Sequence, residues 1–422
     1  MSIRRIDSIR RSLIVREGIR VHSQRARGMR HVDLTDVQLA SSETARRINR
    51  DIVLELIRAN QPISRADLSR RSGLQRSTVS QIVEQLIGEK WVCEGAVASA
   101  PRGRRPTLIG LNDDLVVIAV DIHPKQATVA TVDLQGRLLS RAQISLSTEP
   151  VASTQRMLNC MLRMQREMSH KSIEGIGISL PGRVDPDTQR LIFAPNLHWP
   201  KFDLKRVIEK KMGLPVKMEN AATACLLAEL TFRRIDGVRD VVLVTVSEGV
   251  GTGVFANGQL ISGHHGMAGE FGHVPLDPAG LRCACGSKGC WETFASCRAA
   301  LRYYKEFQPQ SKEVTFHELL NMAYDDKAAA QALAKQALYI GRGLRMIIAG
   351  FAPSLILVAG DVTSAWHRFG PVIEREVADL TLAGNPPRIL PTHEGEIARL
   401  RGAAALVFQR RTVRPPSSGI SP

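Results

Sequence analysis

One histidine and three cysteines, close together in the chain, constrain what this sequence can fold into more than any other feature. His273, Cys283, Cys285 and Cys290 follow the spacing H-x9-C-x-C-x4-C. Three thiolates and one imidazole are the ligand set of a closed tetrahedral Zn²⁺ site. Because four protein ligands leave no coordination position for water, we expect a structural zinc ion rather than a catalytic one. The alternatives are a disulfide bond and unrelated buried thiols.

The sequence around the cysteines favours the metal over the disulfide. Cys283 and Cys285 are separated by a single residue, too few to bridge comfortably. Gly286 and Gly289 let the backbone fold back so that thiolates close in sequence point at one ion. The chain has seven cysteines in 422 residues, and most of them belong to the cluster or lie in apolar contexts, such as Cys160 and Cys225, which fits a reducing cytosol.

No apolar run reaches the length that would cross a bilayer. We therefore expect a cytoplasmic protein without membrane insertion.

Positive charge is concentrated at the start of the chain. The formal net charge is +16, of which residues 1–112 carry +10. A basic end joined to a more balanced body suggests a polyanionic partner at that end, although a solvated basic surface is the simpler alternative. Residues 1–41 contain nine arginines among scattered apolar residues. We expect this segment to be a disordered extension.

Apolar spacing from residue 42 onward predicts three helices. A first helix ends before Pro62. Ser64 can cap a second helix, which stops at Gly73, and a third begins near Gln75. The apolar residues expected to face inward from the first helix are Ile48, Ile52, Val53, Leu56 and Ile57. Those of the third are Val79, Ile82, Val83 and Leu86.

The outer face of the third helix is polar or basic, which is typical of a helix-turn-helix. Such side chains can enter the major groove of DNA and contact base edges and phosphates. The candidate DNA-contacting residues are Gln75, Arg76, Ser77, Thr78, Ser80 and Gln81, with Arg65 in the second helix. Short strands at 91–93 and 107–109 would form a wing. The alternative is any three-helix core with a polar surface.

An arginine-rich linker follows, over residues 101–112. Gly103 and Pro106 disfavour a helix there. Three arginines on an extended backbone, Arg102, Arg104 and Arg105, suit a narrow and electronegative minor groove. A solvated tether is the alternative.

The rest of the chain alternates buried strands with helices. Residues 115–121 are an apolar strand, and 128–132 are a second strand followed by a turn. Residues 175–185 and 355–361 each combine a strand with a turn. The tail at 412–422 is rich in proline and serine, and we expect it to be disordered.

The segment from Val246 to His273 resembles the signature of the ROK family (repressors, open reading frames and sugar kinases). Seven residues stand at the family's spacing: Gly249, Gly251, Gly253, Gly263, Gly269, Gly272 and His273. The run C-A-C-G-S-K-G-C-W-E is similar to that family's zinc loop. The stretch from Pro62 to Leu86 resembles the winged helix of ROK regulators of the N-acetylglucosamine, xylose or glucose repressor type.

The resemblance implies an α/β protein. It would have an N-terminal winged helix-turn-helix followed by a two-lobed, actin-like (ribonuclease H-like) ATPase or sugar kinase fold. The expected parts are an extension at 1–41, the winged helix at 42–100, the linker at 101–112, the ROK domain at 113–411 with its zinc loop at 273–290, and the tail at 412–422.

The sequence departs from ROK kinases where the chemistry would occur. The family's catalytic aspartate is replaced by Ala221, which cannot accept a proton from a sugar hydroxyl. Where kinases have Asp-x-Gly-Gly-Thr to cradle ATP phosphates, this chain has His123 and Pro124. Glu248 stands in the second phosphate region, where its charge would repel ATP. We therefore expect no kinase activity and no bound ATP.

Several sugar-contacting positions of the family remain. The resemblance assigns sugar binding to Asn196, Asn220, Glu270, His273 and Glu292. In the family the histidine also ligates zinc, and we expect both roles here. The alternative is a degenerate pocket that is retained only as a scaffold.

These features together predict a transcriptional regulator, in the simplest case a repressor, of carbohydrate uptake or catabolism genes. We expect it in the bacterial cytoplasm, associated with the nucleoid when it is bound to DNA. The expected partners are an operator in double-stranded DNA, a sugar or sugar-phosphate effector, and further copies of the chain in a homodimer or homotetramer. One alternative is a sugar kinase with a DNA-binding arm. Another is a repressor controlled by a protein, for example a sugar-transport component, with a vestigial sugar pocket.

Overall fold

A computed structural model describes residues 42–97, 106–194, 197, 199, 202–233, 235, 238–379, 384–392 and 395–408. The predicted extension at 1–41, the predicted tail at 412–422, the three linker arginines and Asn196 lie outside the described residues. Within the described part of the chain, no helix is long and apolar enough to span a bilayer.

The first elements form a winged helix-turn-helix, as predicted. They are α1 (Ser42–Asn60), β1 (Ile63–Ser64), α2 (Arg65–Ser72), α3 (Arg76–Gly88), β2 (Val92–Val97) and β3 (Thr107–Leu111). The three strands form an antiparallel sheet in the order β1-β3-β2. The end of the predicted 101–112 linker is therefore part of a strand.

Local sequence signals place the ends of α2. The Ser64 side chain accepts a hydrogen bond from the backbone N–H of Asp67 and caps the N-terminus of the helix. The helix ends at Gly73, whose φ of 72° is left-handed and favours glycine. Both ends agree with the prediction.

The predicted inward face of α1 is only partly correct. Val53 and Ile57 are fully buried, but Ile48 and Ile52 are 51% and 40% exposed. Helical spacing identifies one stripe of the helix, but it does not say how far along that stripe other elements pack.

The body begins with a five-stranded sheet in the order β10-β7-β4-β5-β6. Its strands are β4 (Leu115–Ile122), β5 (Gln126–Asp133), β6 (Leu138–Ser145), β7 (Ser172–Leu180) and β10 (Val216–Asn220). Alternate residues of β4 face opposite sides, and Ile118 and Val120 pack toward α4 (Pro150–Glu167) and α5 (Leu204–Met212). Because both faces are covered, β4 reads as a continuous apolar run.

A second five-stranded sheet has the order β13-β12-β11-β14-β15. Its strands are β11 (Val241–Val246), β12 (Val250–Ala256), β13 (Gln259–Leu260), β14 (Leu355–Gly360) and β15 (Arg388–Pro391). On one face, Val242 and Val244 belong to the same apolar core as residues of α8 (Cys297–Phe307), α10 (Lys327–Phe351) and α11 (Trp366–Ala378). The other face packs on α6 (Ala221–Phe232).

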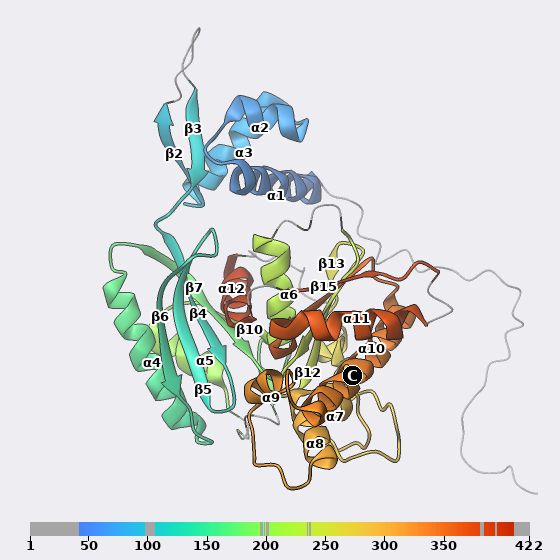
Figure 1. The fold of residues 1–422 in the computed structure, drawn as a ribbon. Coiled ribbons are helices and arrows are strands. Elements are labelled where there is room, and N and C mark those ends of the chain that lie inside the picture. The colour runs from blue at the N-terminus through green and yellow to red at the C-terminus, as the bar shows by residue number, and fades with distance from the viewer. Residues whose placement is uncertain are drawn as a thin grey trace, which may run out of the picture. The chain divides into compact units, whose positions relative to one another are not determined.

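Two helices lie between the sheets (Figure 1). These are α6, which contacts β11 and β12, and α12 (Gly395–Phe408), which contacts β4, β5, β7 and β10. The helices also pack on each other, and a Cβ atom added at Gly402 would overlap the carbonyl oxygen of Ala224. Residues 221–223 of α6 and Arg399 of α12 line the cleft between the sheets.

Shorter elements complete the body. They are β8 (Arg183–Val184), β9 (Leu191–Phe193), η2 (His264–Gly266), η3 (Glu270–His273), α7 (Glu292–Ala295), α9 (Phe316–Met322) and η4 (Asp361–Ala365).

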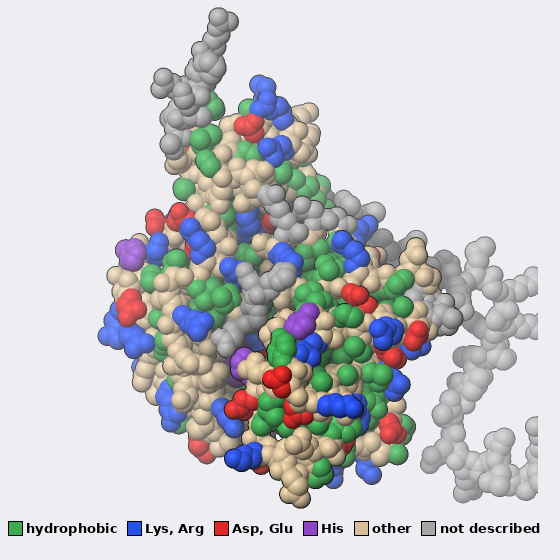
Figure 2. All heavy atoms as spheres, viewed as in Figure 1, with side chains coloured by type: hydrophobic (Ala, Val, Ile, Leu, Met, Phe, Trp, Pro, Cys, Tyr) green, Lys and Arg blue, Asp and Glu red, His purple; other side chains and the backbone are tan. Residues whose placement is uncertain are grey.

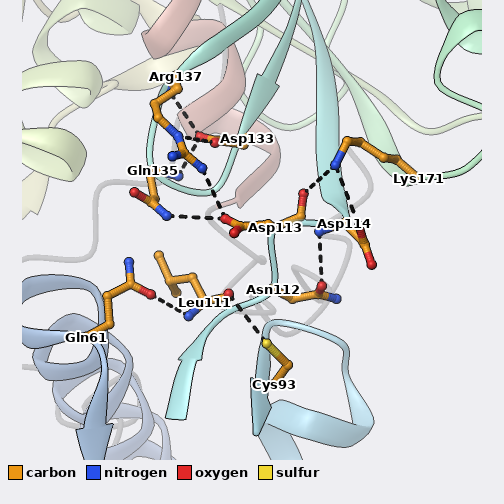
Figure 3. A network of polar contacts seen from close by, with 10 residues as sticks. All are labelled: Gln61, Cys93, Leu111, Asn112, Asp113, Asp114, Asp133, Gln135, Arg137 and Lys171. Atoms are coloured by element: carbon orange, nitrogen blue, oxygen red, sulfur yellow. Dashed lines mark hydrogen bonds and ion pairs between the residues drawn. The ribbon is translucent and has the colours of Figure 1, made fainter. Parts of the chain in front are cut away.

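Only Asn112, Asp113 and Asp114 separate β3 of the winged helix from β4 of the body. Polar contacts hold this junction from both sides (Figure 3). Gln61 Oε1 accepts a hydrogen bond from the Leu111 backbone N–H at 2.6 Å. On the body side, the Arg137 guanidinium donates to Asp133 Oδ2 at 2.6 Å and to Asp113 Oδ1 at 3.1 Å.

Candidate functional site

The candidate DNA-contacting residues lie on the outer face of α3. Gln75, Arg76, Ser77 and Gln81 are exposed, and Thr78 and Ser80 are half-buried. The apolar residues predicted to face inward from this helix, Val79, Ile82, Val83 and Leu86, are all buried. The structure thus brings these six polar residues to one accessible surface, and their contact with DNA stays a prediction.

Arg65 is placed differently from the other candidates. Its guanidinium donates to Glu84 Oε1 at 2.7 Å and to Glu94 Oε1 at 2.6 Å. These two carboxylates come from α3 and β2, so Arg65 links the helices to the wing.

On the face shown in Figure 2, Lys and Arg side chains are interspersed with Asp and Glu over the body.

His273, Cys283, Cys285 and Cys290 converge on one point in the body. One ligand atom from each residue lies within 4.8 Å of the other three. The Cys283 Sγ lies 3.5 Å from the His273 Nδ1, and the Cys285 Sγ lies 3.6 Å from the Cys290 Sγ. Two sulfur ligands of a tetrahedral zinc ion are about 3.8 Å apart, because each Zn–S bond is about 2.3 Å. The four residues therefore fit a tetrahedral metal ion.

Backbone geometry brings the three thiols together. The Cys283 N–H donates to the Ser287 carbonyl at 2.8 Å and closes a tight loop around Gly286. Gly289 has a φ of 65°, and a Cβ atom there would overlap the Asp277 carbonyl oxygen. Only glycine fits at this position, so the residue before Cys290 is set by sterics.

His273 joins the metal cluster to a neighbouring cavity. Its Nδ1 faces Cys283, whereas its Nε2 lies 3.7 Å from Glu270 Oε2. Glu292 is buried beside the cluster, and its Oε2 accepts a hydrogen bond from the Val250 N–H at 3.2 Å. A metal ion bound here would therefore fix side chains that also line the cavity.

The cavity lies between the loops of the two sheets and has a volume of about 360 Å³. This is the size of a small-molecule site. The first-sheet part contributes His123, residues 181–184 and residues 219–223 to its wall. The second-sheet part contributes residues 247–252, residues 266–270, His273 and Glu292. Arg399 of α12 also lines it.

Four of the five predicted sugar-binding residues line this cavity, and the fifth, Asn196, lies outside the described residues. Glu270, His273 and Glu292 line it together. Asn220 lines it as well, but its amide caps α6 by accepting from the Ala222 N–H at 2.8 Å and donates to the Gly182 carbonyl at 2.9 Å. The protein thus already engages both ends of the Asn220 amide.

Burial raises the pKa of two glutamate side chains in the cavity wall, Glu270 and Glu219. Burial raises the pKa of the Glu270 carboxyl above its ordinary value, although His273 and Arg183 lower it in part. Burial also raises the pKa of Glu219 to about 7, against a hydrogen bond from the Asn220 N–H. Glu219 was not among the predicted site residues. Its position directly before Asn220 was the signal that could have identified it.

Replacing Glu219 by glutamine is expected to change how stability depends on pH. Between its ordinary pKa of about 4.5 and the native value of about 7, the native state holds the proton and the unfolded chain releases it. Stability therefore falls as the pH rises through this window, and Glu219→Gln removes that fall. The variant should gain roughly 1–3 kcal/mol over the wild type between pH 5 and pH 8, measured by urea unfolding. If the free energy of unfolding of the wild type and of Glu219→Gln changed with pH in the same way, the prediction would be wrong. The control Glu149→Gln changes an exposed glutamate and should give a curve parallel to that of the wild type.

The positions at which we expect a departure from ROK kinases also line the cavity. Ala221 begins α6 and presents no carboxylate there. The His123 Nε2 lies 2.7 Å from Asp121 Oδ2, and Arg399 Nη1 lies 3.3 Å from both nitrogens of the same ring. Arg399 Nη2 also lies 3.5 Å from the Ser247 hydroxyl. Arg399 thus links turns of both sheets, a role that sequence reasoning did not identify.

Comparison with known proteins covers both parts of the chain. A model of winged helix-turn-helix DNA-binding domains matches residues 43–92. The chain is 31% identical over 379 residues to the xylose repressor of Bacillus subtilis (strain 168), covering 88% of this chain and 98% of the repressor. It is 27% identical over 349 residues to the DNA-binding transcriptional dual regulator NagC of Escherichia coli (strain K12), covering 80% of this chain and 86% of NagC.

Solved structures show the same architecture. A ROK family transcriptional regulator described as a homologue of the Escherichia coli MLC protein superposes with a TM-score of 0.74 at 27% identity, covering 86% of this chain and 96% of that chain. A ROK family glucokinase from Streptomyces griseus, in complex with glucose and AMPPNP, superposes with a TM-score of 0.63 at 29% identity, covering 70% of this chain and 100% of that chain. These matches confirm the predicted fold, a winged helix followed by a sugar kinase-like body. A model described as the ROK family matches residues 117–410, and the chain belongs to this family.

Proposed function

We propose that this protein is a DNA-binding transcriptional regulator, in the simplest case a repressor, of genes for carbohydrate uptake or catabolism. One observation carries the proposal. A single chain joins a winged helix with an exposed polar face on α3 to a body whose cavity gathers carboxylate and imidazole side chains. The relatives named as a xylose repressor and as a transcriptional regulator cover both of these parts.

The effector of this regulator is a sugar or a sugar derivative. Glu270, Glu292 and His273 supply acceptors and a ring nitrogen to the cavity, which suits a ligand rich in hydroxyl groups. Binding would shift the population between two arrangements of the body and thereby change the fit of paired winged helices to an operator. A homodimer or homotetramer would present these winged helices in pairs. Because the protein acts on DNA in this proposal, we propose the bacterial cytoplasm as its location.

The metal ion in this proposal is a structural Zn²⁺ held by His273, Cys283, Cys285 and Cys290. Their donor set of one nitrogen and three sulfurs suits zinc, and all four positions of a tetrahedron are taken by protein atoms. The ion would hold the loop that carries Glu292 against the cavity.

The body is proposed to be non-catalytic and to bind no ATP. Ala221 offers no base for phosphoryl transfer, and Pro124 in the cavity wall has no backbone N–H to donate to a phosphate. The relative glucokinase from Streptomyces coelicolor is 30% identical over 310 residues, covering 69% of this chain and 97% of that enzyme, so a kinase assay is the direct check. ATP-dependent phosphorylation of glucose or xylose by the purified protein would replace this proposal with the kinase alternative.

Genome-wide mapping of bound DNA tests the regulatory role. Discrete peaks beside carbohydrate uptake or catabolic genes would support it and would identify the operator. Titration of that operator with protein in the presence of xylose, glucose or N-acetylglucosamine would then identify the effector. An operator affinity that none of these sugars changes, with no thermal shift, would favour control by a protein partner such as a sugar-transport component.

Replacing Arg76 by alanine is expected to weaken operator binding by about 1–3 kcal/mol, because an arginine at the start of a recognition helix can contact base edges and phosphates. The variant should also bind with a smaller dependence on salt concentration. Lys211→Ala, which removes the same charge from the exposed end of α5, is the matched control. Equal affinities of both variants, measured by mobility shift over a range of salt, would refute the assignment of α3.

A further inference from the structure

One segment of the second-sheet half lies over the cavity and contacts the first-sheet half. Residues 262–269, S-G-H-H-G-M-A-G, follow β13 and lead into η3. Ser262, Gly266, Met267 and Ala268 line the cavity wall. The tip of the segment lies against β8, which belongs to the other half of the body.

A hydrogen bond joins this tip to the first-sheet half. The His265 Nδ1 lies 3.0 Å from Asp185 Oδ2, in the loop that follows β8. The two residues are 80 positions apart in the chain. The His265 side chain is 62% exposed, whereas that of Asp185 is 11% exposed. The histidine is therefore the accessible partner and the aspartate the buried one.

Asp185 is anchored within its own loop. Its Oδ1 accepts hydrogen bonds from the backbone N–H of Thr188 at 2.7 Å and from that of Asp187 at 3.1 Å. The Thr188 hydroxyl donates to the same oxygen at 2.9 Å. The Thr188 N–H, with His265 next, holds the pKa of Asp185 well below its ordinary value. The Asp185 carboxylate is thus held in place by its own loop and forms a hydrogen bond with His265.

The backbone of the tip is adapted to this contact. Gly266 has a φ of 70°, and a Cβ atom there would overlap the Val184 carbonyl oxygen. His265 has a φ of 50° and a ψ of 32°, in the left-handed region that residues with a side chain rarely adopt. Such a conformation persists where surrounding contacts favour it, and the Asp185 hydrogen bond and the packing on Val184 are such contacts.

We propose that residues 262–269 form a flap that closes the cavity, and that the contact between His265 and Asp185 is its latch. Breaking the latch releases the tip from β8 and opens the cavity between the two halves. The identity of the ligand behind the flap rests on the proposed function, whereas the latch itself rests only on the contacts of the flap. A ligand enters and leaves while the latch is open, so the latch sets how long the ligand stays.

Hydrogen exchange of the ligand-free protein tests the latch directly. The Met267 N–H donates to the His264 carbonyl and the Ala268 N–H donates to the Ser262 carbonyl, so both amides report on the backbone conformation that the latch stabilises at the tip of the flap. His265→Ala should raise their exchange rates about three- to tenfold, which is the value of one hydrogen bond. His264→Ala is the matched control, because it removes the neighbouring ring, which packs on the His265 ring at a centroid distance of 3.9 Å, and leaves the hydrogen bond between His265 and Asp185 in place. His265→Gln keeps a side-chain donor and should restore part of the protection.

Sugar dissociation provides the second measurement, with xylose, glucose and N-acetylglucosamine as the probes. For each sugar that binds, His265→Ala should raise the dissociation rate about three- to tenfold, and His264→Ala should leave it within twofold. Equal exchange rates in His265→Ala and His264→Ala would overturn the latch whatever the sugar results. If the wild type binds none of the three sugars, the effector assignment fails, while the exchange data still decide whether the latch exists.

Discussion

Replacing Cys290 by serine is expected to release the metal ion and to lower the free energy of unfolding by at least about 3 kcal/mol. Cys290 is fully buried, and it precedes Trp291, one of the largest fully buried side chains in the protein. The Trp291 ring packs in the core beside α10, and its Nε1–H donates to the Tyr339 carbonyl at 2.8 Å. Losing the ion would therefore free a segment that the core depends on.

Metal analysis and urea unfolding of the same preparations check this prediction. The wild type should contain one zinc ion per chain, and chelation should lower its stability toward that of the variant. Cys160→Ser is the control, because Cys160 is also buried but lies outside the cluster. A wild type without stoichiometric zinc, or a Cys290→Ser variant that unfolds at the same urea concentration, would show that the site is not structural zinc.

Two glycine-to-alanine substitutions in helices are expected to act with opposite signs. At Gly402, a Cβ atom would overlap the backbone of Ala224, so Gly402→Ala must push α6 and α12 apart. This overpacking should cost about 1–3 kcal/mol, or more if the two helices cannot shift. At Gly350 in α10, no atom lies within 4 Å of the added Cβ. Gly350→Ala should therefore stabilise the protein by up to about 1 kcal/mol.

The comparison of these two variants tests the helix crossing, because the chemical change is the same while Gly402 lies at the crossing in the middle of α12 and Gly350 lies in the open last turn of α10. Urea unfolding measures both effects. Because α6 and α12 both carry residues of the cavity wall, Gly402→Ala should also weaken sugar binding, which Gly350→Ala should leave intact. If both variants gain stability, the two helices do not pack as closely as described here.

Much of the winged helix could be predicted from the sequence, because its signals are local. The cap at Ser64, the stop at Gly73 and the buried residues of α3 each depend on neighbours within a few positions. The metal cluster was predicted for the same reason, since three of its four ligands lie within eight residues of one another. In α1 the same reasoning failed at Ile48 and Ile52, because burial there depends on elements outside the helix.

The cavity could be predicted only in part. Resemblance to the ROK family identified Glu270, His273 and Glu292, which do line it. It did not reveal that the amide of Asn220 is already engaged, that Arg65 is held by two carboxylates, or that Glu219 is present in the wall. Each of these facts depends on which partner a side chain meets, and the type of residue alone does not state the partner.

The sequence by itself determined the elements of this protein and the residues that can bind a metal ion, because helix caps, apolar periodicity and ligand spacing act over short stretches of chain. Only the tertiary structure decided how distant side chains combine. Arg399 meets His123 across 276 positions, and His265 meets Asp185 across 80. Such contacts arise from the packing of two sheets around α6 and α12, which brings the ends of separate strands and helices to one cleft. No local pattern in the sequence records that packing. The contacts of Arg399 and of His265 at the cavity could therefore be identified only from the folded chain.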